Sequence, residues 1–181
     1  MMKTKSVYFS AFRGGNIIPA NFETWMEDMA IQGWKVEKIG QWSSLKMDFI
    51  EIAPKKYRFV YDMNSFPNEE YKSIYEQFGW EYVGQMASAV IWRKEYTDQR
   101  PESFSDLESV EKRNKRVINA VKINFVLFLT AAISFLGTAA LKPASLSLSD
   151  IVQFIIMGLF MLLITIYLGS VIYAIRKNMD R

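Results

Sequence analysis

Residues 21–34 read NFETWMEDMAIQGW, and residues 71–80 read YKSIYEQFGW. In the first stretch the apolar residues at positions 22, 25, 26, 29 and 30 have the spacing of an amphipathic helix. Positions 71, 74, 75 and 78 repeat that spacing in the second stretch. Both stretches end in Gly-Trp, and the two Gly-Trp pairs lie 46 residues apart. The pattern predicts two related helices within an internal duplication.

The two glycines are expected to end these helices. Gly33 and Gly79 stand where a helix needs a left-handed residue, and only glycine adopts that conformation without a Cβ clash. The residue after such a glycine often packs back on the helix, so we expect Trp34 and Trp80 to pack on the last helical turns. The alternative is that these tryptophans line a ligand pocket.

Alternating apolar and polar residues, typical of strands, surround each predicted helix. Residues 5–52 and 56–96 therefore each read as β-α-β-β with antiparallel hairpins. This order predicts an α+β domain over residues 1–96, because one helix per repeat covers a sheet face. We expect a ferredoxin-like or related arrangement of the two halves, with both helices on one face.

The opposite face of the predicted sheet is the expected interaction surface. Residues 1–96 hold 19 of the 27 aromatic residues, and an apolar face could bind a partner protein, a second copy of the chain or a flat apolar ligand. The candidate surface residues are Trp25, Trp42, Tyr82 and Trp92. The alternative is that these aromatic side chains only form a dense, small core.

Two long apolar segments follow the domain. Residues 123–141 and 151–175 carry no charge, and about 20 apolar residues are enough to cross a bilayer. We expect a charged linker over 97–116, transmembrane helices over 117–141 and 151–175, an external loop over 142–150, and a tail over 176–181. Lys and Arg are concentrated at residues 112–116 and 176–181, which predicts that both chain ends are cytoplasmic. The expected location is therefore a bacterial cell membrane.

Small residues recur at helical spacing in these segments and could let helix backbones approach closely. We interpret them as a helix–helix interface, either within the hairpin, or in an oligomer or a complex with a larger membrane protein. The residues are Thr130, Ser134 and Thr138 in the first segment and Gly158, Thr165 and Gly169 in the second.

The composition argues against catalysis. The chain has no Cys and no His, which excludes disulfides, zinc fingers, Cys nucleophiles and Ser-His-Asp triads. Glu27-Asp28 and Glu69-Glu70 are interpreted as solvated helix faces rather than acid–base pairs, so we expect no enzyme, no metal and no cofactor. The net charge of +3 arises after residue 116, in the most apolar third, which disfavours a nucleic-acid partner.

These motifs resemble an uncharacterised bacterial domain-of-unknown-function family. The resemblance covers residues 5–96 and rests on Gly33-Trp34, on Lys56-Tyr57-Arg58-Phe59, and on Gly79-Trp80 with Trp92. Members have duplicated helix–Gly-Trp–strand units, often a C-terminal membrane hairpin, and genes often near PadR-type regulators. The resemblance implies an accessory or sensing role at the membrane and identifies no functional residues.

The expected function is therefore that of a membrane-anchored cytoplasmic sensing or adaptor protein. Its domain would bind a partner protein or a small apolar ligand and modulate a transcription regulator or an exporter. Its expected partners are the lipid bilayer and a protein or a second copy of the chain. The alternative is a small non-catalytic subunit of a membrane transport complex.

Overall fold

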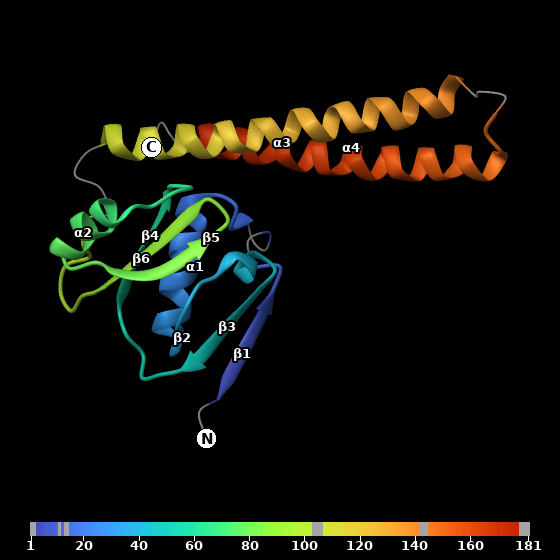
Figure 1. The fold of residues 1–181 in the computed structure, drawn as a ribbon. Helices are drawn as coiled ribbons and strands as arrows, with labels where there is room; N and C mark the ends of the chain where they lie inside the picture. The colour runs from blue at the N-terminus through green and yellow to red at the C-terminus, as the bar shows by residue number, and fades with distance from the viewer. Residues whose placement is uncertain (1–2, 11, 13–14, 103–106, 142–144, 178–181) are drawn as a thin grey trace. The chain divides into compact units, whose positions relative to one another are not determined.

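The computed structural model describes residues 3–10, 12, 15–102, 107–141 and 145–177. The chain divides into two compact units, Met1–Arg113 and Asn114–Arg181. The first is an α+β region with two three-stranded antiparallel sheets, and the second consists of two long apolar helices packed as a hairpin (Figure 1). The first unit extends past residue 96, into the segment expected to be a linker.

The first half of the α+β region contains three strands, one helix and a short 3-10 turn. In chain order these are β1 (Thr4–Tyr8), α1 (Pro19–Ile31), β2 (Trp34–Val36), the turn η2 (Gln41–Ser44) and β3 (Lys46–Glu51). Strand β3 lies between β1 and β2 and is antiparallel to both.

The second half repeats this plan. Its elements are β4 (Tyr57–Met63), α2 (Glu69–Gln77), β5 (Glu81–Met86) and β6 (Ala89–Glu95). Strand β6 lies between β4 and β5 and is antiparallel to both. The predicted β-α-β-β order is therefore present twice, and the third strand is central in both halves.

The two halves form separate sheets, which corrects the expectation of a ferredoxin-like arrangement. Among the described residues, one isolated parallel bridge links Ile39, in the segment after β2, to β5, and there the Ile39 N–H donates to the Val83 carbonyl at 3.0 Å. Gly84 beside it has φ +147°, and a Cβ there would overlap the Ile39 carbonyl oxygen. The register of β5 also shifts between Tyr82 and Gly84. This irregular edge of β5 therefore limits pairing between the halves to a single bridge.

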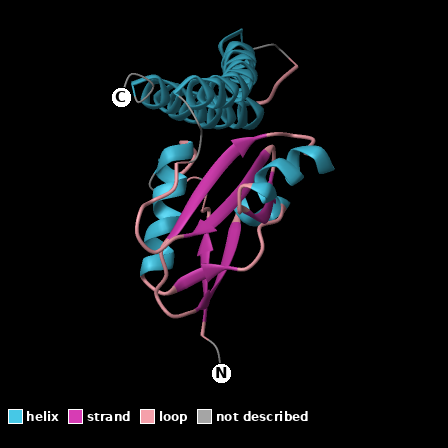
Figure 2. Cartoon of the chain, turned by 90° about the vertical axis from the view of Figure 1, so that its left-hand side faces the viewer, coloured by secondary structure: helices cyan, strands magenta, loops and turns pink. Residues whose placement is uncertain are grey.

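Helices α1 and α2 lie on opposite sides of the strands (Figure 2). Helix α1 packs against both sheets: the Phe22 ring lies 5.7 Å from that of Tyr61 in β4, and Trp25 lies 5.7 Å from Phe49 in β3. These contacts belong to one core that residues of both halves share.

Helix α2 covers the other face of the second sheet. Its Tyr75 ring stacks on Trp92 of β6 with centroids 4.4 Å apart. The expectation that both helices share a face is wrong, because Val90, Ile91 and Trp92 are all fully buried and successive strand residues point to opposite faces. A strand without an exposed face needs cover on both sides.

Both Gly-Trp glycines have positive φ, +83° at Gly33 and +76° at Gly79. After α2 the Gly79 N–H donates to the Glu76 carbonyl at 2.8 Å, and the Trp80 N–H donates to the Tyr75 carbonyl at 3.1 Å. This pair of bonds is the Schellman arrangement that satisfies the last carbonyls of a helix. Trp80 is buried in a cluster that Tyr75 joins.

The second unit contains most of α3 (Leu107–Leu141) and all of α4 (Leu148–Lys177). By length and composition, both helices could cross a membrane. Gly158 of α4 faces α3 closely, because a Cβ there would lie 2.6 Å from the Leu136 Cγ. The rings of Phe135 and Phe154 lie 5.8 Å apart across the same hairpin.

Candidate functional site

Two glutamates of α1 cover the outer edge of β4. The Glu23 carboxylate accepts a hydrogen bond from the backbone N–H of Tyr61 at 3.0 Å, and Glu27 accepts one from Phe59 at 3.3 Å. Strand β4 is an edge strand, whose alternate N–H groups point away from the sheet. Spacing of i, i+4 places the two glutamates on one side of α1. The helix therefore closes an edge that would otherwise be open to pairing.

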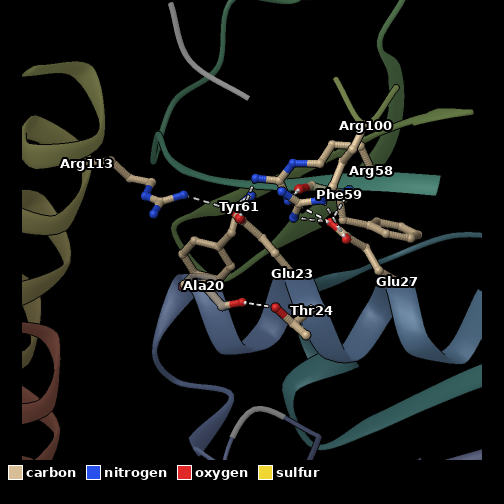
Figure 3. Close-up of polar contacts among 9 residues, drawn as sticks. All are labelled: Ala20, Glu23, Thr24, Glu27, Arg58, Phe59, Tyr61, Arg100 and Arg113. Atoms are coloured by element: carbon tan, nitrogen blue, oxygen red, sulfur yellow. Dashed lines mark hydrogen bonds and ion pairs between the residues drawn. The ribbon is translucent and has the colours of Figure 1, made fainter. Parts of the chain in front are cut away.

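Three arginines neutralise the two carboxylates (Figure 3). Arg58 of β4 bridges them, with Nη2 3.0 Å from Glu23 Oε2 and Nη1 2.7 Å from Glu27 Oε1. Arg113 Nη1 lies 2.7 Å from Glu23 Oε1, while Arg100 donates to both oxygens of Glu27 at 3.0 and 3.1 Å. We call these five residues the edge-cap network.

Most of the network is removed from water. The side chains of Glu23, Arg58 and Arg113 are each at most 6% exposed, whereas Arg100 is 50% exposed. Removing one partner of such a buried pair costs about 3–5 kcal/mol, because the other charge is left unpaired. Burial also raises the pKa of the neighbouring Tyr61 to about 12, although the charge of Arg113 opposes this shift.

The network offers structural linkage rather than acid–base chemistry. An arginine side chain does not release its proton near neutral pH, and both carboxylates already accept several hydrogen bonds. Among the described residues, no group of three or more Asp or Glu could hold a metal ion. The arrangement joins α1, β4 and the segment that contains Arg100 and Arg113.

The edge-cap network corrects the interpretation of Glu27 as part of a solvated face, and sequence reasoning missed Glu23 altogether. The available signal was that Glu23 follows Phe22 and that Glu27 follows Met26, so both glutamates flank the apolar stripe. A glutamate beside a stripe is usually exposed. Only the position of β4, remote in sequence, decides that these two are buried.

The four aromatic candidates do not form one surface. Trp92 is fully buried, and its indole N–H donates to the Tyr71 hydroxyl at 3.1 Å. Trp25 packs half-buried against the shared core, and Tyr82 is 37% exposed beside the Trp92 ring. Only Trp42 is largely exposed, at 78%. Trp92 is therefore not a surface residue, because α2 covers that side of the second sheet; Trp25 and Trp42 lie elsewhere, on α1 and η2.

Trp42 instead belongs to a group of exposed apolar side chains on two linked loops. The Phe9 N–H donates to the Leu45 carbonyl, and the buried Ser10 hydroxyl donates to the Ser43 carbonyl at 2.5 Å. These bonds connect the segment after β1 to η2. We call the exposed group the aromatic loop surface; its members are Tyr8, the last residue of β1, and Phe9, Phe12, Trp42 and Leu45 on the loops.

The small residues of the two apolar helices fall into two sets. On α4, Gly158 and Thr165 are buried and Gly169 lies against Phe125, where a Cβ would be 3.5 Å from the ring. On α3, Thr130 and Ser134 are exposed, and Thr138 is intermediate. The α4 set therefore contributes to packing within the hairpin, whereas Thr130 and Ser134 leave α3 with an exposed small-residue face.

A family model described as a protein of unknown function, DUF2812, matches residues 20–127. The chain belongs to the DUF2812 family. No curated protein and no solved structure matches the chain. The DUF2812 match starts later than the resemblance inferred for residues 5–96 and runs on into α3. It includes all five residues of the edge-cap network and leaves out β1.

Proposed function

We propose that this chain is a membrane-anchored sensing or adaptor protein of bacteria, and that its α+β domain binds a partner protein at the aromatic loop surface. The observation that supports it is that surface: five large apolar side chains are 41–78% exposed, four of them on hydrogen-bonded loops and Tyr8 at the end of β1. Exposed apolar groups of this size mark interaction sites more often than scattered single residues do. The family resemblance suggests a PadR-type transcription regulator as the partner; an exporter is the other partner that we propose.

A protein partner is better supported than a small apolar ligand. The described hollow of about 460 Å³ lies on the outer face of the first sheet, and polar or charged residues such as Ser6, Lys46 and Asp48 form most of its lining. Apolar ligands favour pockets lined by hydrophobic and aromatic side chains. The exposed aromatic groups lie on loops instead, where a second protein can reach them.

The membrane part of the proposal rests on α3 and α4. We propose that both helices span the membrane and that both chain ends are cytoplasmic, since Arg176 and Lys177 follow the second span and Lys115 and Arg116 precede the apolar part of the first. A reporter fused after Arg181 should then be active only on the cytoplasmic side. Activity of that reporter outside the cell would reverse the topology.

Site-specific crosslinking tests the partner surface. A photoreactive residue in place of Trp42 in the full chain, expressed in cells, should capture a defined protein. The matched control replaces Phe66, an aromatic residue that is 92% exposed on another loop. The identified protein should bind the purified full chain, and Trp42→Ser should weaken that binding at least tenfold. Equal capture from both positions, or capture of this chain alone, would contradict the proposal.

The second candidate function is that of a non-catalytic subunit of a membrane transport complex. The exposed small-residue face of α3 favours it, because small residues let another helix approach closely. Ser134→Leu should then abolish co-purification of the complex while leaving the hairpin intact. Gly169→Leu is a poorer test, since Gly169 lies against Phe125 inside the hairpin. An unchanged complex in Ser134→Leu would exclude this function.

A further inference from the structure

The four edge strands of the two sheets differ in how their outer sides are covered. The glutamates of α1 cap β4, and β5 meets the segment after β2 at the Ile39–Gly84 bridge. The edge of β2 is met by Arg93, whose Nη1 donates to the Val36 carbonyl at 2.8 Å. Strand β1 has β3 on one side and, within the part of the chain that the structure describes, no strand on the other.

The direction of the free backbone groups follows from the bonds that β1 makes. The Lys3 carbonyl accepts from Glu51, and the Phe9 N–H donates to Leu45, so the odd-numbered residues face β3. Backbone groups alternate along a strand, so the N–H and C=O groups of Thr4, Ser6 and Tyr8 point outward. No described residue bonds to these outward backbone groups.

We propose that β1 pairs antiparallel with β1 of a second copy of this chain, centred on Ser6. In this register Ser6 lies opposite Ser6 of the second copy, and Thr4 lies opposite Tyr8. All three outward residues of each strand can then exchange both backbone hydrogen bonds with the other strand. Because Ser6 is the middle outward residue, any other centre leaves some of these groups unpaired.

The charges of β1 are compatible with this register. Lys5 lies opposite Val7 of the second copy and not opposite a second lysine, so no like charges face each other. A lysine on an edge strand often blocks pairing. Here, however, Lys5 Nζ lies over the Trp34 ring at 5.4 Å, and Lys3 pairs with Glu51 at 3.4 Å. Both charges are therefore drawn toward their own domain.

The proposal goes beyond the proposed function, because it assigns the backbone edge of β1; of the aromatic loop surface it involves only Tyr8. It also uses no property of the apolar helices. On the outer face, the pairing would cover part of Tyr8, which is 62% exposed, by placing it beside Thr4 of the second copy. Aromatic and β-branched residues make favourable cross-strand pairs.

Single-cysteine crosslinking of the full chain tests the register. The chain has no Cys, so Ser6→Cys introduces one thiol, and opposite residues in hydrogen-bonded pairs lie about 5.5 Å apart at Cα, within disulfide reach. Mild oxidation should link Ser6→Cys chains at least ten times faster than Ser65→Cys, an exposed serine on another loop. Lys5→Cys should also link slowly, because two copies of residue 5 are not opposite.

The oligomeric mass of the wild-type chain in detergent gives a second test. This measurement needs no substitution, so a misfolded variant cannot affect it. The mass should be that of a dimer, and Ser6→Lys should convert the dimer to a monomer by placing two ammonium groups opposite each other. A monomeric wild-type chain, or linkage no faster at residue 6 than at residue 65 in a variant with wild-type circular dichroism, would overturn the proposal. A dimer insensitive to Ser6→Lys would equally place the contact elsewhere.

Discussion

The two halves of the α+β region share one topology and differ in burial. Helix α1 buries Phe22, Met26 and Met29 against both sheets, whereas α2 has no fully buried residue and rests on Trp92 through its tyrosines. The second sheet is covered on both faces. The first sheet exposes a polar outer face that carries Ser6 and Asp48. A repeated topology therefore does not imply a repeated environment.

The two halves are joined through contacts that involve backbone groups. The described contacts between the halves include backbone polar groups: Glu23 accepts from the Tyr61 N–H and Glu27 from the Phe59 N–H, Arg93 donates to the Val36 carbonyl, and the Ile39 N–H donates to the Val83 carbonyl. The second half contributes its strands to the common core. The first half retains the outer edge of β1 and the aromatic loop surface, whereas the second half exposes Phe66, Ile74 and Phe78.

The largest expected effect comes from Glu23→Ala. It removes the acceptor of the Tyr61 N–H and takes one carboxylate partner from each of two buried arginines, Arg58 and Arg113, so the free energy of unfolding should fall by about 3–5 kcal/mol. Tryptophan fluorescence during urea unfolding reports on the first unit, since all five tryptophans lie in residues 1–96.

The matched control is Glu69→Ala, because Glu69 lies 46 residues after Glu23 in the repeat and its side chain is 90% exposed. Its change should stay within about 0.5 kcal/mol. Similar losses in both variants would mean that the equivalent positions share an environment after all.

Gly84→Ala should break the bridge between the sheets. A non-glycine residue at a strained φ costs about 1–3 kcal/mol, and the added Cβ would also overlap the Ile39 carbonyl oxygen. We expect the melting temperature of the first unit to fall by several degrees. Gly40→Ala is the control, since nothing lies within 4 Å of a Cβ there. Equal melting temperatures for the two variants would show that the bridge does not hold the halves together.

The local pattern predicted much of this fold. The apolar spacing and the Gly-Trp pairs indicated α1 and α2, and strand alternation indicated β-α-β-β in each half. These signals lie within 10–15 residues of one another, which is the range over which side-chain periodicity acts. The arrangement of the halves depended on β5, where the Gly84 irregularity leaves only one bridge. The periodicity of apolar and polar residues does not reveal this irregularity.

The candidate site was much less predictable. Trp25, Trp42, Tyr82 and Trp92 are all aromatic, but their environments differ: α2 covers Trp92, Trp25 packs on Phe49 from α1, and Trp42 is exposed on η2. The edge-cap network joins Glu23 to Arg113, and these residues are 90 positions apart. Their burial follows from a strand edge that the sequence does not mark, since a glutamate beside an apolar stripe is typical of an exposed position.

Glu81→Gln tests a smaller contact, the ion pair between Glu81 and Arg93, whose guanidinium also bonds to the Val36 carbonyl of the first half. The hydrogen bond from Arg93 is the main cause that lowers the pKa of Glu81. The stability that this ionised pair contributes is therefore fully present above the unfolded-state pKa of Glu81, and it is lost as the pH falls through the folded-state pKa. The variant should lose about 1 kcal/mol at pH 7, because the carboxylate is mostly exposed and screened.

Urea unfolding at pH 7 and at pH 3 measures this difference. The wild-type chain should lose more stability than Glu81→Gln over that pH interval, and Glu76→Gln, at an exposed position on α2, should behave like wild type. Parallel pH profiles for wild type and Glu81→Gln would mean that the Glu81–Arg93 pair adds no stability to the fold.

The smallest expected effect separates a core tryptophan from a surface one. Trp42→Ser should change the free energy of unfolding by no more than about 0.5 kcal/mol, since an indole that is 78% exposed has little packing to lose. Trp80→Ser, at 8% exposure, should cost about 3 kcal/mol or more. Removal of Trp42 should also shift the native emission to shorter wavelength, because the most solvated tryptophan is gone. A loss above 1 kcal/mol at Trp42 would show that its ring packs within the domain, and the aromatic loop surface would then lack its most exposed member.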